Sequence, residues 1–317
     1  MLRTLTATLL FVALTSVASA ATIHVERPAS VGGVLELRFS FPGWVDAAEV
    51  ELRSGDASSD GPVVARTWAF TRADWDRWVG LIGVPSWSDP GEYTVVAHLY
   101  QIAESDPGIG RIVRRMTTVE IQPREFRRER IALNRAMSTL RRDDSEERRR
   151  QSVELAELLR TTNPASIYTL RNFVRPVQSE RRTSWFGDRR TFEYSDGAVA
   201  GSIHHGVDFG VPTGTPVSAP AAGRVVLARS RIITGNTVVI EHLPGVYTLY
   251  YHLDRLDVTE GEMVRSGVLI GTVGSTGLST GPHLHWELRV AGVPVDPEPF
   301  LVRPILDFRP DSGKIGG

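Results

Sequence analysis

Apolar and polar residues alternate along the first third of the chain. Leu35, Leu37 and Phe39 are separated by single polar residues, and residues 93–99 show the same alternation after an Asp-Pro-Gly turn. A period of two is typical of half-buried β-strands, and repeated short strands separated by turns are typical of β-sandwiches. We therefore predict an immunoglobulin-like β-sandwich over residues 21–123.

The pattern changes in residues 124–160, which contain no glycine or proline and are dense in arginine and glutamate. Apolar residues recur there at loosely helical spacing. Asp144 followed by Glu147 resembles a capping box, which would begin a second helix that ends before the Asn-Pro pair at 163–164. We predict a helical connector with two helices within residues 124–172.

From residue 173 onward the pattern is again that of strands. Apolar, β-rich runs separated by glycine turns predict an antiparallel sheet within a domain of residues 173–308; these runs are residues 225–240, 246–251, 264–273 and 285–290. Residues 191–201, rich in small and polar side chains, are predicted to be a loop that walls a cleft. The fold class is thus mainly β, and residues 309–317 are expected to form a loose tail.

The first 20 residues have the features of a secretory signal peptide. Arg3 precedes an apolar core at residues 9–14, and Ala18-Ser19-Ala20 forms a small-residue cleavage site. The apolar run is short for a membrane span of about 20 residues. We therefore expect an exported protein of the periplasm or cell envelope with no transmembrane span after cleavage.

Composition removes several other classes of function. The chain has no cysteine, which excludes disulfides, a lipid-modified cysteine and a cysteine nucleophile. Its 36 basic residues nearly balance 37 acidic ones, so the formal net charge is -1 and no global field attracts nucleic acid. Arginines in the connector are interleaved with acidic residues, which predicts an ion-paired surface. We expect no nucleic-acid partner.

Two clusters carry the candidate chemistry. His283 and His285 are two apart on a predicted strand, so both side chains point to one face. His204 and Asp208 flank Gly206, whose neighbours disfavour a helix, so this pair also shares a face of an extended segment. A catalytic zinc site has three protein ligands and a fourth open position. His204, Asp208 and one of the histidines at 283 and 285 would complete that set.

Other polar residues are candidates to assist such a site. His252 follows a third apolar run and is a candidate catalytic or supporting group. Tyr250, Tyr251 and Asn236 are candidates to orient the metal site, with no pattern to choose among them. His205 lies beside a candidate ligand on the opposite pleat, so we expect it at the surface or behind the ligands.

Together these residues resemble the lysostaphin and LytM type zinc metallopeptidases, which cut the peptide part of the bacterial cell wall. The family's His-x-Gly-x-Asp motif matches at His204 and Asp208, its His-x-His motif at His283 and His285, and its Tyr-x-His-Leu motif at His252. The resemblance covers roughly the last two fifths of the chain. It implies one zinc ion per chain on His204, Asp208 and His285, with His283 as general base. His252 would assist by donating a hydrogen bond to the developing oxyanion.

The resemblance implies a secreted or periplasmic zinc metalloendopeptidase that hydrolyses peptidoglycan, acting as a monomer on stem or cross-bridge peptides. The alternative is a catalytically silent relative that binds the wall or activates an amidase; the intact ligand set favours the enzyme. A cupin-like barrel would need a glutamate where Arg289 stands. A lipoyl or biotinyl carrier would need a lysine at a hairpin tip, and none is present there.

Overall fold

The computed structural model describes residues 21–55, 61–102 and 109–307. The predicted signal peptide at 1–20 and the predicted tail at 309–317 lie outside these residues. Within the described part of the chain, no helix combines the length and apolar character needed to cross a membrane.

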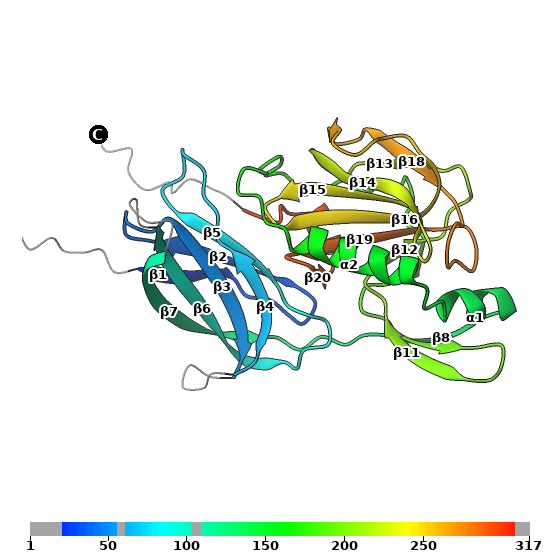
Figure 1. The fold of residues 1–317 in the computed structure, drawn as a ribbon, viewed down its shortest axis with the longest axis horizontal. Coiled ribbons are helices and arrows are strands. Elements are labelled where there is room, and N and C mark those ends of the chain that lie inside the picture. The colour runs from blue at the N-terminus through cyan, green and yellow to red at the C-terminus, as the bar shows by residue number, and fades with distance from the viewer. Residues whose placement is uncertain (1–20, 56–60, 103–108, 308–317) are drawn as a thin grey trace, which may run out of the picture.

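Two antiparallel sheets pack against each other in the first part of the chain (Figure 1). Their strands are β1 (Thr22–Arg27), β2 (Val34–Ser40), β3 (Ala47–Ser54), β4 (Val63–Trp68), β5 (Trp78–Gly83), β6 (Gly91–Ile102) and β7 (Ile109–Ile121). One sheet has the order β1-β2-β5 and the other β4-β3-β6-β7. Leu35, Leu37 and Phe39 are buried between them, as the alternation predicts. The more specific immunoglobulin-like assignment stays a prediction.

The connector differs from the prediction in its first half. It contains a strand, β8 (Arg128–Ala132), followed by two helices, α1 (Arg135–Arg141) and α2 (Glu146–Arg160). The expected helix was wrong at β8 because these residues find a parallel partner strand in a distant part of the chain. Helix α2 is present, but its N-cap is Ser145, whose Oγ accepts a hydrogen bond from the backbone N–H of Arg148 at 3.2 Å.

The partner of β8 lies in the segment that we expected to be a loop. Residues 191–201 instead belong to a hairpin of β10 (Arg189–Glu193) and β11 (Val199–Ile203), and β8 adds to β10 as the third strand. Gly197 in the hairpin turn has φ +85°, a conformation that glycine adopts without strain. Polar, small residues thus form strands here because a tertiary neighbour completes the hydrogen bonding.

The C-terminal part contains a ten-stranded antiparallel sheet, in agreement with the predicted fold class. Its elements are β9 (Arg182–Ser184), β12 (Gly206–Phe209), β13 (Pro216–Ser218), β14 (Gly223–Arg231), β15 (Gly235–Leu243), β16 (Val246–Leu256), β17 (Met263–Val264), β18 (Leu269–Val273), β19 (Leu284–Val290) and β20 (Val293–Val295), and a short 3-10 helix follows at Glu298–Leu301. The main path runs β17-β14-β15-β16-β19-β12-β9, so β12 lies between β19 and β9. Helix α2 crosses beside this sheet, while α1 lies near the three-stranded sheet β11-β10-β8 (Figure 1).

The two parts of the chain share buried surface. Val79 and Leu81 of β5 belong to the same apolar cluster as the C-terminal sheet. A Cβ at Gly83 would lie 2.8 Å from Cβ of Val293, so only glycine permits this approach. Arg124 bonds Asp296 across the same junction at 2.6 Å. The front part therefore packs on the sheet that carries the candidate site.

Candidate metal centre

His204 lies in the link between β11 and β12, where the backbone holds it on both sides. Its N–H donates to the carbonyl of Asp188 at 2.9 Å, and its carbonyl accepts from the N–H of Gly187 at 2.8 Å. The ring Nδ1 donates to the carbonyl of Trp185 at 2.8 Å. Since a carbonyl oxygen can only accept, the neutral ring directs the lone pair of Nε2 toward the neighbouring strands.

Asp208 and His285 are brought face to face by strand pairing. They are directly opposite in the antiparallel register of β12 and β19. Gly206 permits this pairing, because a Cβ at that position would lie 2.4 Å from the carbonyl oxygen of Trp286. The glycine of the motif is thus required by the close approach of two backbones.

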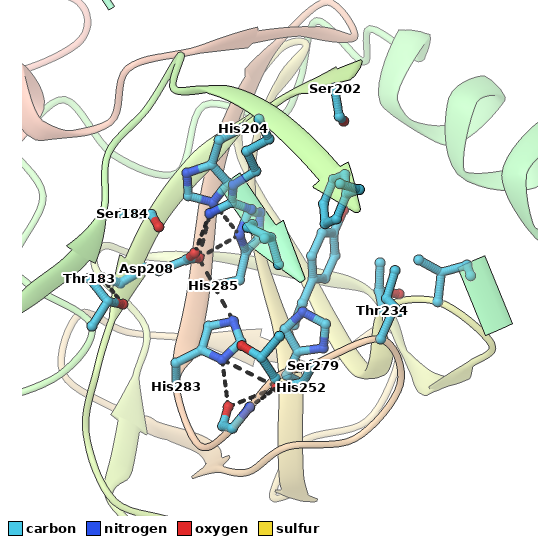
Figure 2. A pocket seen from close by; sticks show the side chains of 18 of the residues that line it. Thr183, Ser184, Ser202, His204, Asp208, Thr234, His252, Ser279, His283 and His285 are labelled. Carbon is cyan, nitrogen blue, oxygen red and sulfur yellow. Dashed lines mark hydrogen bonds and ion pairs between the residues drawn. The ribbon is translucent and has the colours of Figure 1, made fainter. Parts of the chain in front are cut away.

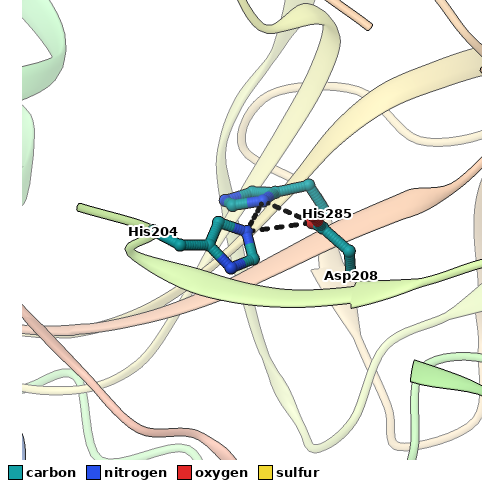
Figure 3. Close-up of side chains that lie close together, drawn as sticks. All are labelled: His204, Asp208 and His285. Atoms are coloured by element: carbon teal, nitrogen blue, oxygen red, sulfur yellow. Dashed lines mark hydrogen bonds and ion pairs between the residues drawn. The ribbon is translucent and has the colours of Figure 1, made fainter. Parts of the chain in front are cut away.

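Three donor atoms converge at this point (Figure 3). His204 Nε2 lies 3.1 Å from Asp208 Oδ1 and 2.9 Å from His285 Nδ1, and the latter two are 2.8 Å apart. All three residues are buried. Two imidazole nitrogens and one carboxylate oxygen are a ligand set that zinc accepts in catalytic sites.

The carboxylates around His285 favour a positive charge at this point. His285 Nε2 donates to Glu287 Oε1 at 2.9 Å, so in the neutral ring Nδ1 carries a lone pair, like Nε2 of His204. Burial opposes charge on His285, but the carboxylates of Asp208 and Glu287 outweigh it and raise the pKa of His285 to about 9. The site thus attracts a proton to Nδ1, and a metal ion that displaces it would satisfy all three lone pairs.

The Asp208 carboxylate is itself held in its charged form. Burial alone would raise its pKa, but His204 and His285 together bring the pKa well below the usual range. Its second oxygen, Oδ2, accepts from Arg190 Nη2 at 2.8 Å. Both oxygens therefore have partners: Oδ1 contacts the two histidines and Oδ2 the arginine.

Partners behind the ligands extend the network in two directions. Glu287, which orients His285, accepts a hydrogen bond from Arg289 Nε at 2.6 Å. Arg190, which orients Asp208, also pairs with Glu129 of β8. Such outer partners set the orientation and basicity of metal ligands. Sequence analysis missed Arg190, Glu129 and Glu287, because no local pattern shows that Glu129 and Arg190, 61 positions apart, meet behind Asp208.

We expect Arg190→Gln to lower the affinity for zinc roughly 10-fold to 100-fold, the usual effect of removing an outer partner of a ligand. The variant leaves Asp208 Oδ2 without its cation, so the carboxylate loses its fixed orientation. Competition with a chelating indicator would measure the change. Arg130→Gln is the matched control, since Arg130 pairs with Glu193 at the surface of the same sheet. Equal affinities in the two variants would show that Arg190 does not support the ligand.

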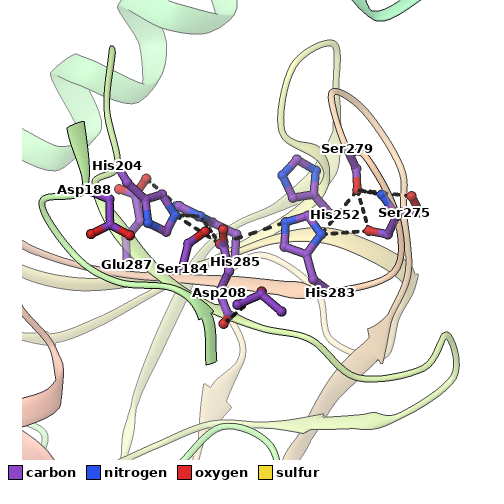
Figure 4. A network of polar contacts seen from close by, with 12 residues as sticks. Ser184, Asp188, His204, Asp208, His252, Ser275, Ser279, His283, His285 and Glu287 are labelled. Atoms are coloured by element: carbon purple, nitrogen blue, oxygen red, sulfur yellow. Dashed lines mark hydrogen bonds and ion pairs between the residues drawn. The ribbon is translucent and has the colours of Figure 1, made fainter. Parts of the chain in front are cut away.

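His252 and His283 line the cleft beside the three donors (Figures 2 and 4). His283 Nδ1 donates to the carbonyl of Gly281 at 2.8 Å, so in its neutral form Nε2 is free to accept a proton. That Nε2 lies 3.9 Å from Asp208 Oδ1. His283 is therefore placed next to the metal centre without belonging to the converging donors.

His252 is held in an unusual conformation. Its φ is 62°, in the left-handed region that non-glycine residues rarely adopt. The backbone N–H donates to Thr234 and the ring Nδ1 donates to the carbonyl of Thr276 at 2.7 Å. Burial, together with the imidazoles of His283 and His285, lowers the pKa of His252 to about 3. With Nδ1–H given to Thr276, Nε2 of the neutral ring is unprotonated, whereas the expected hydrogen bond to an oxyanion requires a proton there.

The cleft has a volume of about 540 Å³. Residues of the ten-stranded sheet and of the three-stranded sheet β11-β10-β8 form its walls. Three residues were candidates to orient the metal site, and of these Tyr251 lies at the converging donors. Its ring stacks on that of His285 with centroids 5.2 Å apart. Tyr250 is buried and bonds Thr248 instead. Asn236 bonds the carbonyl of Asp254 and is not among the cleft residues. His205 does line the cleft.

Comparison with known proteins gives matches to the C-terminal part. Residues 202–297 match peptidase family M23. The chain is 50% identical over 95 residues to DD-carboxypeptidase/endopeptidase Mpg of Neisseria meningitidis serogroup B, covering 30% of this chain and 22% of that protein. It is 44% identical over 121 residues to peptidoglycan DD-endopeptidase ShyA of Vibrio cholerae (38% and 28%) and 36% identical over 140 residues to lysostaphin of Staphylococcus staphylolyticus (41% and 29%). The chain thus spans less than a third of these curated relatives.

A comparison with solved structures gives a similar fold over most of the chain. The crystal structure of a putative peptidase M23 from Pseudomonas aeruginosa covers 87% of this chain and 96% of its own, with a TM-score of 0.58 and 24% identity. This likeness concerns the fold, and it extends beyond the residues that match the family.

Proposed function

We propose that this chain is a zinc metalloendopeptidase that hydrolyses peptide bonds of bacterial cell-wall peptidoglycan, and the match of residues 202–297 to peptidase family M23 supports this proposal. The observation that carries the proposal is the convergence of His204 Nε2, Asp208 Oδ1 and His285 Nδ1 in a buried site beside an open cleft. Relatives named as peptidoglycan endopeptidases support the substrate class.

In the proposed mechanism, His204, Asp208 and His285 hold one zinc ion. When bound, zinc polarises the scissile carbonyl and lowers the pKa of water to about 7. His283 Nε2 takes a proton from the attacking water, because its Nδ1–H is already donated to Gly281. The protonated ring then returns this proton to the leaving amine.

His252 has a different proposed role from the one implied by the family resemblance. Its unprotonated Nε2 accepts a hydrogen bond, so it orients the second proton of the attacking water. With the pKa of His252 at about 3, the ring stays neutral at pH 7 while His283 carries the proton. Two neighbouring imidazoles, with ring centroids 4.9 Å apart, thus divide orientation and proton transfer between them.

The cell envelope is the proposed location, because peptidoglycan lies outside the cytoplasmic membrane and the first 20 residues have signal-peptide character. The rival function is a silent relative that binds the wall or activates an amidase. The complete donor set and the free Nε2 of His283 favour the enzyme, because a protein that only binds has no use for a proton acceptor at that position.

We expect the mature protein to release new amino groups from purified peptidoglycan, and we expect this release to stop when a chelator removes zinc and to resume when zinc is restored. Hydrolysis requires the metal, whereas binding to the wall does not. Labelling of the free amino groups followed by mass spectrometry identifies the bond. Binding of the wall without any new amino group, in zinc-loaded protein, would favour the silent alternative.

A further inference from the structure

Arg141, the last residue of α1, lines the cleft one helical turn after Met137. Its guanidinium carbon lies 3.8 Å from the centroid of the Phe192 ring. The Nε atom is shielded from water and has no hydrogen-bond partner. Because Nε is closed to solvent, an acceptor that enters the cleft would meet the two Nη groups, for which the described residues provide no hydrogen-bond partner.

The acidic groups around Arg141 are committed to other partners. Arg190 pairs with both Glu129 and Asp208. Glu193 pairs with Arg130, Asp196 with Arg142 and Glu287 with Arg289. Asp143 accepts a hydrogen bond from the backbone N–H of Ser145. Among the described residues, none provides Arg141 with a carboxylate, so its positive charge in the cleft is not neutralised by the protein.

The contact with Phe192 also determines how a ligand would approach. The aromatic ring covers one face of the guanidinium, and the N–H donors lie in its plane. A ligand must therefore meet the edge of the group, where a planar carboxylate can accept two parallel hydrogen bonds. The stacked ring fixes the side chain in advance, which reduces the entropy lost on binding.

We propose that Arg141 binds a free carboxylate of the substrate peptide, and that the enzyme thereby prefers acidic stem peptides to amidated or neutral ones. This inference rests on the proposed function, because it assigns the substrate class of the same cleft. Stem peptides of peptidoglycan carry carboxylates on acidic residues and at chain ends, and some of these groups occur as amides. Replacing a carboxylate by a carboxamide keeps the shape and removes the charge.

The test uses cross-linked stem peptides in which each carboxylate in turn is replaced by a carboxamide. With the zinc-loaded full-length protein, we expect one replacement to lower kcat/KM roughly 10-fold to 100-fold, the range for a hydrogen-bonded charge pair. Arg141→Gln should cleave the unmodified peptide and the peptide with that replacement with similar kcat/KM. The loss should fall on KM for the acidic peptide.

Two further variants make the result decisive. Arg142→Gln removes the neighbouring arginine, which pairs with Asp196 in solvent, and should keep the full preference. Arg141→Lys keeps the charge without the planar fork and should keep part of the preference, which also covers the case that Arg141→Gln does not fold. If the wild-type protein cleaves no peptide, the proposed function fails. If it cleaves all of them equally, or if Arg141→Gln keeps the preference, the endopeptidase stands and the role of Arg141 is overturned.

Discussion

His204→Ala should purify without zinc and should not hydrolyse peptidoglycan above the background rate. The substitution removes one of three donors, and the two that remain form an incomplete site for a tetrahedral ion with one open position. Asp208→Ala should behave in the same way and should also leave the guanidinium of Arg190 without its second carboxylate. Elemental analysis of the purified protein measures the metal, for which we expect about one zinc ion per chain in the wild type.

The control for this result is His24→Ala. His24 lies on β1 with an exposed side chain, far in the fold from the converging donors, and its replacement should change neither zinc content nor activity. Circular dichroism of each variant establishes that the fold persists. Full zinc content in both His204→Ala and Asp208→Ala would refute the assigned ligand set.

His283→Ala should keep zinc and lose turnover by roughly 10²-fold to 10⁴-fold, the usual contribution of one positioned acid-base group. The distinction follows from geometry. His285 Nδ1 lies 2.8 Å from Asp208 Oδ1 and belongs to the donors, whereas His283 Nε2 lies 3.9 Å from the same oxygen. His285→Ala should therefore lose both zinc and activity.

Zinc content and kcat, measured on the same preparations, separate the two histidines. Zinc retained in His285→Ala and lost in His283→Ala would mean that the roles are exchanged and that the motif is aligned in the wrong register. A third outcome, normal turnover in His283→Ala, would transfer the role of base to His252, whose Nε2 is also unprotonated.

Much of the architecture follows from local sequence. Alternation of apolar and polar residues, as at Leu35 and Leu37, identifies strands because a strand buries every second side chain. The metal donors could be proposed for a similar reason. His-x-Gly-x-Asp and His-x-His combine side chains that bind zinc with backbone that favours extended structure, and the family resemblance adds which histidine is the ligand.

Other features depend on partners that are distant in the chain. Residues 128–132 carry weak local preferences, so they form a strand only because β10 offers a free edge, and the small, polar segment at 191–201 becomes a hairpin for the same reason. The energy of such pairing comes from hydrogen bonds between strands, which no periodicity within one segment reveals. Our predictions of a helix and a loop were wrong at these two places.

The sequence by itself determined that this protein is mainly β and which short motifs bring together histidine and aspartate. Only the tertiary structure decided which partners surround them: Arg190 bonds Asp208, Glu287 bonds His285, and Arg141 lines the same cleft. It also decided the proton positions, since the carbonyls of Gly281 and Thr276 determine which ring nitrogen of each cleft histidine is free. The physical reason is that a motif specifies which groups are present, whereas their orientation, charge and protonation depend on neighbours that folding supplies.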